Sequence, residues 1–238
     1  TSATEGVKIP KFVGMENPRR INFLKKEIPS QLTICTVVSK EKDKLNTLVQ
    51  LLEFIGEEPG IIFCNYKDSI ESVSTFLSEQ GILHECFSGG MEQRDRERAL
   101  IKFRNGSSRI LVATDLAARG IDITELKFIV HYELPHRIEE FTHRNGRTAR
   151  VNELGTAYVL KWEKEKLPEF IEASTPIKIN PSKRLGDPFW ETLFISGGRK
   201  DKISKGDIAG LFFKQGDLNR DQLGDIELKQ DCAFVKKL

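Results

Sequence analysis

The 238-residue chain has no long hydrophobic run, few cysteines and almost no excess of charge of either sign. No stretch of about 18 apolar residues occurs, so we expect no membrane-spanning helix. Apolar residues nevertheless make up 39% of the chain, which excludes a disordered tail. Lys and Arg number 37 and Asp and Glu 35, so the net charge of +2 gives no indication of a nucleic-acid partner. The length fits one large domain or two modest ones.

The four cysteines form no C-x-x-C pair, and three of them lie in apolar, strand-like segments, where Cys behaves as a small hydrophobic residue. Because a disulfide framework requires a small secreted chain rich in Cys, we expect free thiols in a reducing, cytoplasmic setting. The four histidines lack partners at metal-ligand spacing, so we predict no metal site. The chain starts at Thr1 without a basic and apolar leader, and we interpret it as a fragment without a signal peptide.

Strand-like and helix-like patterns alternate between residues 33 and 175. Short apolar or β-branched runs predict strands at 33–38, 61–64, 84–87, 110–113, 128–131 and 157–160. Apolar residues at helical spacing, or charged stretches between strands, predict helices at 45–55, 70–77, 91–103, 137–148 and 163–172. This alternation predicts an α/β fold with a parallel sheet covered by helices on both faces. Ligands of such sheets bind outside the carboxyl ends of the strands.

The composition changes after residue 175. Residues 176–189 are rich in Pro, Asn, Ser and Gly and predict a linker. Beyond this linker, we expect strands at 190–195, 226–228 and 233–235 and a helix at 207–213. The sequence therefore predicts a small α+β segment after the α/β domain.

The segment His143–Arg150 (HRNGRTAR) carries an arginine at every third position. On a helix, Arg144, Arg147 and Arg150 would spread over about a third of the circumference. Three cations on one face repel one another, whereas a polyphosphate would bind them because each guanidinium can hold phosphate oxygens with two hydrogen bonds. For the arginines alone, a solvated basic face is the alternative.

Two further segments follow predicted strands. In residues 112–123 (VATDLAARGIDI), Thr114 could offer its hydroxyl and backbone N–H to a phosphate, and the alternative is a loop in which Asp115 caps a helix. In residues 88–96 (SGGMEQRDR), Gly89 and Gly90 let a backbone approach a ligand closely, and the helix start that follows suits an anion. The alternative there is an ordinary turn.

Together these motifs resemble the second RecA-like domain of DEAD-box RNA helicases. HRNGRTAR matches the H-R-x-G-R-x-x-R motif of that family, and VATDLAARGID matches the motif before it. Further matches are Gln93-x-x-Arg96, residues 61–65 and the HYELP stretch at 131–135, and residues 1–4 resemble the end of the Ser-Ala-Thr motif that closes the first RecA-like domain. The resemblance assigns residues 1–30 to that motif and an inter-domain linker, and residues 31–175 to the RecA-like helicase C-terminal domain.

The resemblance implies a nucleotide side of the site. Arg147 and Arg150 would reach the γ-phosphate of ATP across a cleft, and Asp122 would lie near the ribose. His143 and Arg144 would couple the nucleotide to the Ser-Ala-Thr segment and so take part in catalysis. The sequence has neither a G-x-x-x-x-G-K-[ST] loop nor an Asp-Glu-Ala-Asp box. The phosphate cradle and the Mg²⁺ ligands would therefore belong to a preceding domain, and we do not expect this chain alone to hydrolyse ATP.

The resemblance also implies an RNA side, to which it assigns Gly90, Arg96, Thr114 and Arg119. Such contacts go to phosphates and sugars and would read the shape of RNA and not its sequence. Two residues depart from the family pattern: Asn145 stands where an apolar residue or Thr is usual, and Ala149 where Gly is usual. Neither departure removes a charge, so we expect activity to be retained.

The C-terminal segment 190–238 resembles part of an RNA recognition motif. Residues 193–198 (LFISGG) match its first strand and residues 231–238 its third, which would make Phe194 and Phe234 exposed platforms for base stacking. Residues 197–208 resemble the DbpA-type RNA-binding domain. Cys232 and Lys237 stand where aromatic residues are usual, and the sequence has no second helix or fourth strand of the motif. In the alternative interpretation, both phenylalanines are core residues.

We therefore predict the C-terminal part of an ATP-dependent DEAD-box RNA helicase. It would act as a monomer and couple ATP hydrolysis to local unwinding of RNA duplexes, with structured ribosomal RNA, and hence ribosome biogenesis, as the expected setting. One alternative is a non-catalytic RNA-binding protein on a RecA-like scaffold. The other is a superfamily 2 helicase that acts on DNA.

Overall fold

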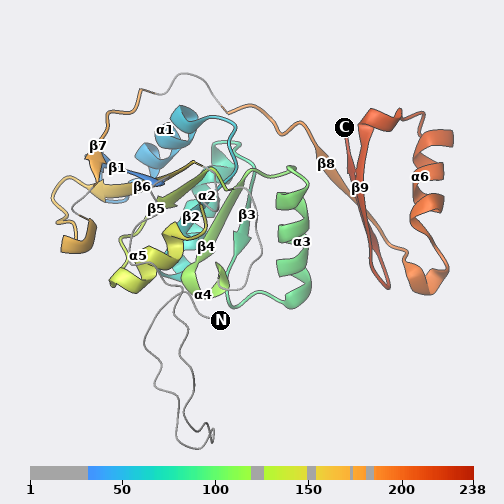
Figure 1. Cartoon of the computed structure of the whole chain (residues 1–238), viewed down its shortest axis with the longest axis horizontal. Helices are drawn as coiled ribbons and strands as arrows, with labels where there is room; N and C mark the ends of the chain where they lie inside the picture. Colours follow the sequence, from blue (N-terminus) through green and yellow to red (C-terminus); the bar gives the residue numbers. More distant parts are fainter. Residues whose placement is uncertain (1–31, 119–125, 149–153, 172–173, 181–184) are drawn as a thin grey trace, which may run out of the picture.

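The computed structural model describes residues 32–118, 126–148, 154–171, 174–180 and 185–238. Within these residues the chain forms a seven-stranded sheet followed by a three-stranded sheet (Figure 1). Neighbouring strands of the first sheet pair in parallel, which confirms the predicted fold. Among the described helices, none is long and apolar enough to cross a membrane. The four cysteines are free thiols, as expected.

The first sheet has the order β3-β4-β2-β5-β6-β1-β7. Its strands are β1 (Leu32–Ser39), β2 (Gly60–Cys64), β3 (His84–Phe87), β4 (Ile110–Thr114), β5 (Phe128–His131), β6 (Gly155–Trp162) and β7 (Thr175–Pro176). The helices between them are α1 (Leu45–Ile55), α2 (Lys67–Glu79), α3 (Gln93–Arg104), α4 (Asp115–Ala118) and α5 (Ile138–Asn145). Strands β3, β4, β2 and β5 are thus neighbours, so the segments after them meet at one edge of the sheet.

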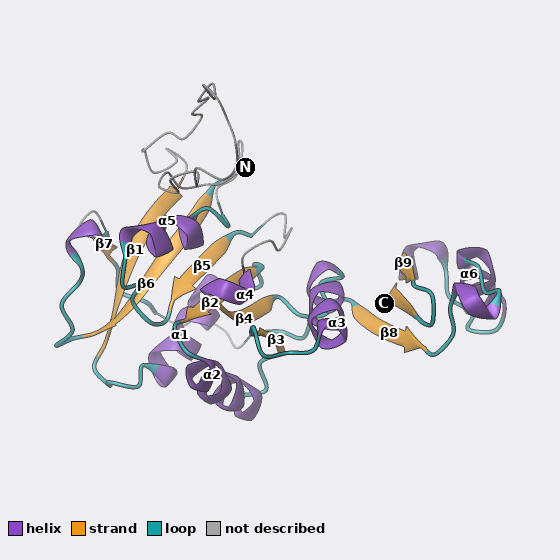
Figure 2. Cartoon of the chain, turned by 90° about the horizontal axis from the view of Figure 1, so that it is seen from below, coloured by secondary structure: helices purple, strands orange, loops and turns teal. Residues whose placement is uncertain are grey.

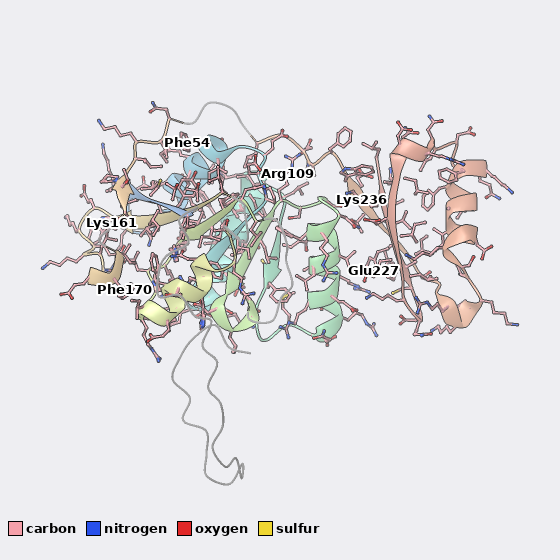
Figure 3. The ribbon with its side chains drawn as sticks, viewed as in Figure 1. Phe54, Arg109, Lys161, Phe170, Glu227 and Lys236 are labelled. Atoms are coloured by element: carbon pink, nitrogen blue, oxygen red, sulfur yellow. The ribbon has the colours of Figure 1, made fainter. Side chains whose placement is uncertain are left out.

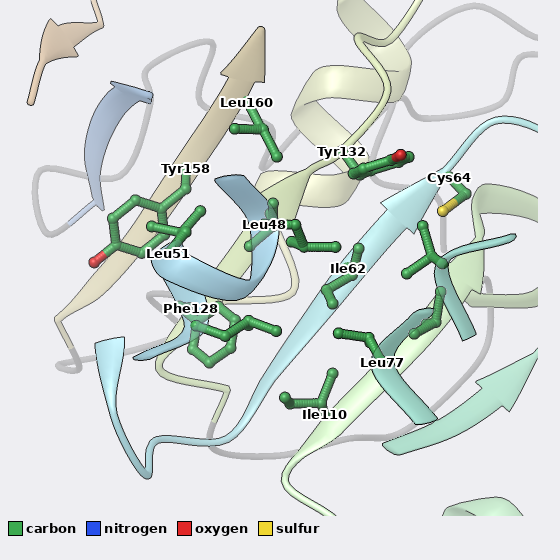
Figure 4. Packing of buried hydrophobic residues seen from close by; sticks show 14 of the residues in the cluster. Leu48, Leu51, Ile62, Cys64, Leu77, Ile110, Phe128, Tyr132, Tyr158 and Leu160 are labelled. Carbon is green, nitrogen blue, oxygen red and sulfur yellow. The ribbon is translucent and has the colours of Figure 1, made fainter. Parts of the chain in front are cut away.

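Each face of the first sheet carries its own apolar cluster, because side chains alternate between the faces along a strand. In β2, Ile61 and Phe63 pack with residues of α3 and α5, whereas Ile62 and Cys64 pack with α1 and α2. Figure 4 shows the second cluster, with Leu48 near Ile62 and Leu51 beside Tyr158. Figure 2 shows α5 on one side of the sheet and α1 with α2 on the other. Burial on both faces explains the continuous apolar runs in the sequence.

Gly60 starts β2 opposite Phe128 of β5, whose ring lies across the glycine. A Cβ at position 60 would overlap that ring, which is buried and packs against Tyr158. We therefore expect Gly60→Ala to lower the free energy of unfolding by ~1–3 kcal/mol, as measured by urea denaturation. Gly210→Ala is the matched control, since a Cβ there meets no atom within 4 Å in a helix interior, and it should raise stability slightly. An unchanged stability of Gly60→Ala would show that the ring moves freely.

The predicted charged helix at 163–172 is wrong. Within the described part of that range, residues 163–171, the only helical element is a 3₁₀ turn, Glu169–Ile171. Pro168 cannot donate a helical hydrogen bond and disfavours helical backbone in the residue before it. The Glu165 side chain instead accepts a hydrogen bond from the backbone N–H of Trp162, 3.1 Å away. The high charge of this segment was therefore not a helix signal.

The second sheet has the antiparallel order β8-β10-β9 and agrees with the predicted small α+β segment. Its strands are β8 (Glu191–Ile195), β9 (Leu223–Leu228) and β10 (Ala233–Lys237), and helix α6 (Lys205–Lys214) covers one face. Helix α6 starts at a capping box in which Ser204 and Asp207 accept hydrogen bonds from each other's backbone N–H groups. The opposite face of this sheet turns toward α3, and Figure 3 shows Glu227 and Lys236 on that side.

Candidate functional site

The carboxyl ends of β2, β3 and β4 meet at a cavity of about 430 Å³. Each strand leads directly into the cavity wall: β2 into Asn65, β3 into Ser88 and β4 into Asp115. The segment after β5 adds His136. The described residues that line the cavity are Asn65, Tyr66, Lys67, Ser88, Gly89, Gly90, Thr114, Asp115, Leu116, His136 and Glu140. The cavity therefore lies where a parallel sheet is expected to bind its ligand.

Arg144 of α5 lies behind this cavity with its side chain fully buried. Its Nε and one terminal nitrogen donate hydrogen bonds to the two carboxylate oxygens of Asp115, at 2.9 and 2.6 Å. The same guanidinium donates to the Asn65 side-chain oxygen at 2.6 Å and to the Glu133 backbone carbonyl at 2.8 Å, and it lies over the ring of Phe63. One buried cation thus fixes the segments that follow β2, β4 and β5.

The Glu133 carboxylate makes a second connection across this edge. One of its oxygens accepts a hydrogen bond from the Asn65 backbone N–H at 2.6 Å, and the other accepts one from the Ser69 hydroxyl at 2.8 Å. Sequence reasoning gave Glu133 no role and treated Asp115 only as a helix cap. Asn65, Asp115 and Glu133 nevertheless share one signal, because each is a polar residue within two positions of the end of a buried strand. That position predicts contact at the carboxyl edge of the sheet.

His131 and Asn145 form a buried polar pair beside Arg144. The His131 Nε2 atom lies 3.0 Å from the Asn145 side-chain oxygen, and both residues are buried. Burial and the nearby Arg144 charge lower the pKa of His131 from the usual 6.5 to about 3, so the imidazole is neutral and donates through Nε2. Asn145, which departs from the family pattern, therefore serves as the acceptor for a buried histidine. An apolar residue at position 145 would leave that donor unsatisfied.

This lowered pKa predicts an acid-dependent loss of stability. The unfolded imidazole takes up a proton below about pH 6.5, whereas the folded one stays neutral until about pH 3, so stability falls as the pH drops through this interval. Between about pH 6 and 5, the free energy of unfolding from urea titrations should fall about 1.2 kcal/mol per pH unit more steeply than in His131→Gln. Above about pH 7.5 the two curves should run parallel. Equal slopes in the acid range would contradict a neutral buried imidazole.

The predicted RNA-side residues fall in different places. Gly90 and Thr114 line the cavity. Arg96 is not among its described lining residues, because its guanidinium lies over the ring of Phe87, 4.9 Å from the ring centroid. Arg119, Asp122, Arg150 and Ala149 lie outside the described residues. Tyr66, Lys67, Leu116 and His136 also line the cavity but were missed, although two of them directly follow the motif at 61–65.

The expectation that Arg144 and Arg147 share one helical face is wrong. Helix α5 ends at Asn145, and Gly146 closes it by donating its N–H to the Thr142 carbonyl at 2.9 Å. Arg147 follows in a turn, with its backbone N–H donating to the Arg144 carbonyl at 3.0 Å and its side chain half-buried. Arg144 points inward, whereas His143 is half-buried on α5. Arg144 and Arg147 are therefore held in different environments.

Phe194 and Phe234 are direct cross-strand partners on the sheet face opposite α6. Their ring centroids lie 5.5 Å apart in an edge-to-face arrangement. Phe194 is 51% exposed, but Phe234 is only 6% exposed. The expectation that Phe234 is an exposed platform is therefore wrong, and the reason is that this face of the sheet lies against α3. Within the described residues, no cluster of three or more His, Cys, Asp or Glu could hold a metal ion.

Two family models match separate parts of the chain, one within the region of the first sheet and one over the second sheet. The family model of the helicase conserved C-terminal domain matches residues 43–152, and that of the DbpA RNA binding domain matches residues 192–236. The chain is 36% identical over 205 residues to the ATP-dependent RNA helicase DbpA of Escherichia coli (strain K12), which covers 83% of this chain and 45% of that protein. It is 28% identical over 256 residues to DbpA of Bacillus subtilis (strain 168), covering 94% of this chain and 53% of the relative.

Solved structures support the same assignment. The E. coli DEAD-box protein SrmB, solved bound to regulator of ribonuclease activity A, superposes with a TM-score of 0.56 at 28% identity over 68% of this chain and 99% of that chain. The C-terminal domain of the DEAD-box protein Dbp5 gives a TM-score of 0.51 at 27% identity, covering 58% and 80%. The chain spans about half the length of the two DbpA relatives. The chain is thus similar to a helicase conserved C-terminal domain followed by a DbpA RNA binding domain, and to DEAD-box RNA helicases.

Proposed function

We propose that this chain is the C-terminal part of an ATP-dependent RNA helicase that couples ATP hydrolysis to local unwinding of RNA duplexes. The observation that carries the proposal is the carboxyl-edge cavity, in which Gly90 and Thr114 lie beside segments fixed by the buried Arg144. Backbone N–H groups and a hydroxyl at such an edge suit phosphates of an RNA strand. The DbpA RNA binding domain match supports RNA as the ligand.

In the full-length protein, ATP and single-stranded RNA would draw a first RecA-like domain onto this one. Arg147 and Arg150 would then stabilise charge on the γ-phosphate as the phosphoryl group is transferred. Asp122 would contact the ribose, and His143 would couple the nucleotide to the first domain. Mg²⁺ would be held through that first domain. Because Arg144 is buried against Asp115, we assign it the role of positioning the segments around the nucleotide and the RNA.

On the RNA side, Gly90, Thr114, Arg96 and Arg119 would hold the backbone of one strand in a bent path. A bent strand cannot remain paired over its full length, so a short duplex would open locally. Contacts to the backbone alone give no sequence preference. Preference for a structured RNA, such as ribosomal RNA, would then come from the C-terminal domain, in which Phe194 is the exposed aromatic of the pair.

The ATPase of the full-length protein tests this proposal against its two alternatives. We expect single-stranded RNA of about 12 nucleotides to stimulate ATP hydrolysis and DNA of equal length to leave it at the basal rate. Equal stimulation by DNA would indicate a superfamily 2 DNA helicase. RNA binding without any stimulated ATP hydrolysis would instead indicate a non-catalytic RNA-binding protein on a RecA-like scaffold.

A further inference from the structure

A groove of about 820 Å³ lies beside the contact between helix α3 and the second sheet. One wall comes from the RecA-like part and includes Met91, Asp95, Arg98 and Lys102, together with residues of α2 and β3. The other wall is formed by Thr192, Phe194 and Phe234 of the second sheet. The volume is within the range of about 300–1,000 Å³ that is typical of sites for small organic groups.

Polar contacts hold the two walls together. The Thr192 hydroxyl lies 3.0 Å from the Asn105 amide nitrogen and 2.6 Å from the Ser107 hydroxyl, both just after α3. Along α3 itself, the ammonium of Lys229 bridges Glu97 at 2.9 Å and Glu227 at 2.7 Å. These contacts join residues of both domains at two places, so the groove has two fixed walls.

The surfaces that face one another across the groove are those on which unpaired bases stack. The guanidinium of Arg98 lies over the ring of Phe194, 5.2 Å from its centroid, and half of the Phe194 surface remains exposed. Aromatic rings and guanidinium planes are the usual stacking partners of single-stranded RNA bases. Arg98 lies 3.7 Å from Asp95, and Lys102 pairs with Glu85 at 3.0 Å, so cations and carboxylates alternate along this wall. A nucleotide that exchanged these pairs could place its phosphate on the cations and its base donors on the carboxylates.

Burial of Phe234 determines where such a base could lie. On an open sheet, bases would stack on both aromatic rings, but Phe234 is covered here and only Phe194 offers free ring surface. A base must therefore stack on the exposed part of the Phe194 ring, beside the Arg98 guanidinium of α3 that already lies over it. It would contact residues of both domains at once.

The groove begins where the first cavity ends. Ser88, Gly89 and Gly90 line the cavity, and the next residue, Met91, lines the groove. The Met91 sulfur accepts the Ser88 backbone N–H at 3.4 Å, which holds this loop closed on itself between the two spaces. An RNA strand that leaves the cavity along Gly90 therefore meets the groove directly.

We propose that this groove binds one unpaired nucleotide of the RNA strand, with its base stacked on Phe194 and Arg98. Helix α3 would thus supply half of the RNA site of the C-terminal domain, and the two domains would bind one continuous strand. The proposal rests on the proposed function, because it takes RNA as the ligand of the chain.

The test measures binding of the whole chain to a fluorescent oligouridine of about 12 nucleotides by anisotropy, at one fixed salt concentration. Arg98→Ala and Phe194→Leu should each weaken binding about 5- to 50-fold. Arg104→Ala is the matched control, since Arg104 is an exposed cation on the same helix that lines neither space, and binding should change by less than about 2-fold. Phe213→Leu on α6 is the matched control for Phe194→Leu, because Phe213 is also an exposed phenylalanine, and binding should again change by less than about 2-fold. Thermal unfolding of each variant by circular dichroism confirms that it is folded.

An RNA backbone without bases distinguishes the contribution of base stacking to binding from that of the phosphate charges. Against an abasic ribose-phosphate oligomer of equal length, Phe194→Leu should bind as well as the unchanged chain, while Arg98→Ala should still bind more weakly. Photocrosslinking with 5-iodouridine should attach the RNA to the segment containing Met91 or to Phe194. Unchanged or tighter binding of oligouridine by Arg98→Ala, or crosslinks confined to the first cavity, would contradict nucleotide binding in the groove. Either result would leave the proposed function intact. Failure of the unchanged chain to bind any RNA would overturn both.

Discussion

Replacing Arg144 of α5 by Met is expected to lower the free energy of unfolding by ~3–5 kcal/mol. The guanidinium is fully buried and holds Asp115 with two hydrogen bonds. Its loss leaves the Asp115 carboxylate, the Asn65 side chain and the Glu133 carbonyl without their donor. A methionine would fill the space over Phe63 but could satisfy none of these acceptors.

Urea denaturation of the whole chain, followed by far-ultraviolet circular dichroism, measures this effect. Arg137→Met is the matched control, because Arg137 precedes the same helix but its side chain is 77% exposed and its ion pair with Glu140 is 3.7 Å long. Such an exposed pair contributes ~0–1 kcal/mol. Arg144→Lys should be intermediate, since it keeps the charge without the two-fold hydrogen bonding to Asp115. A loss below ~1 kcal/mol for Arg144→Met would contradict the role of Arg144 as the connection between the three segments.

The fold could be read from the sequence because its signals are local. The buried strands are short apolar runs, as in residues 61–64 and 110–113, and helices α1 and α2 repeat their apolar residues at helical spacing. The failure at 163–172 was local too, because Pro168 was given too little weight against the charges around it. The proline therefore determined the backbone conformation of this segment, and the charges did not.

The candidate site was only partly predictable because its connections are not local. Arg144 meets Asp115 and Asn65, which lie 29 and 79 positions away, and no spacing pattern indicates that the arginine turns inward. The end of α5 at Asn145 separates Arg144 from Arg147, which follows in a turn. Phe234 is covered because the second sheet lies against α3, through contacts such as that between Asn105 and Thr192, which are 87 positions apart. The sequence motifs therefore indicated where the site lies, whereas the contacts of its side chains could be assigned only from the structure.

Arg147 provides the second large effect, this time on the rate of reaction. In the full-length protein, Arg147→Ala is expected to lower kcat for RNA-stimulated ATP hydrolysis about 10³-fold or more, while ATP binding changes little. A cation that acts on the γ-phosphate contributes most when negative charge spreads over the transferring group, so its removal raises the barrier more than it weakens binding. The backbone around Arg147 is held in place for such a role, because its N–H donates to the Arg144 carbonyl and the adjacent Thr148 donates its hydroxyl to the Leu126 carbonyl at 2.6 Å.

Steady-state ATPase assays at saturating RNA, together with binding of a fluorescent ATP analogue, distinguish these two effects. Arg147→Lys should recover only a small part of the rate, because an ammonium cannot hold two phosphate oxygens as a guanidinium does. Arg104→Ala controls for the loss of one positive charge, since Arg104 ends α3 and is exposed away from the carboxyl edge of the sheet. Unfolding free energies of Arg147→Ala and of the unchanged protein should agree within ~1 kcal/mol, unlike those of Arg144→Met. If Arg147→Ala retains RNA-stimulated turnover within about threefold, or loses ATP binding to the same extent as turnover, Arg147 does not act on the transition state.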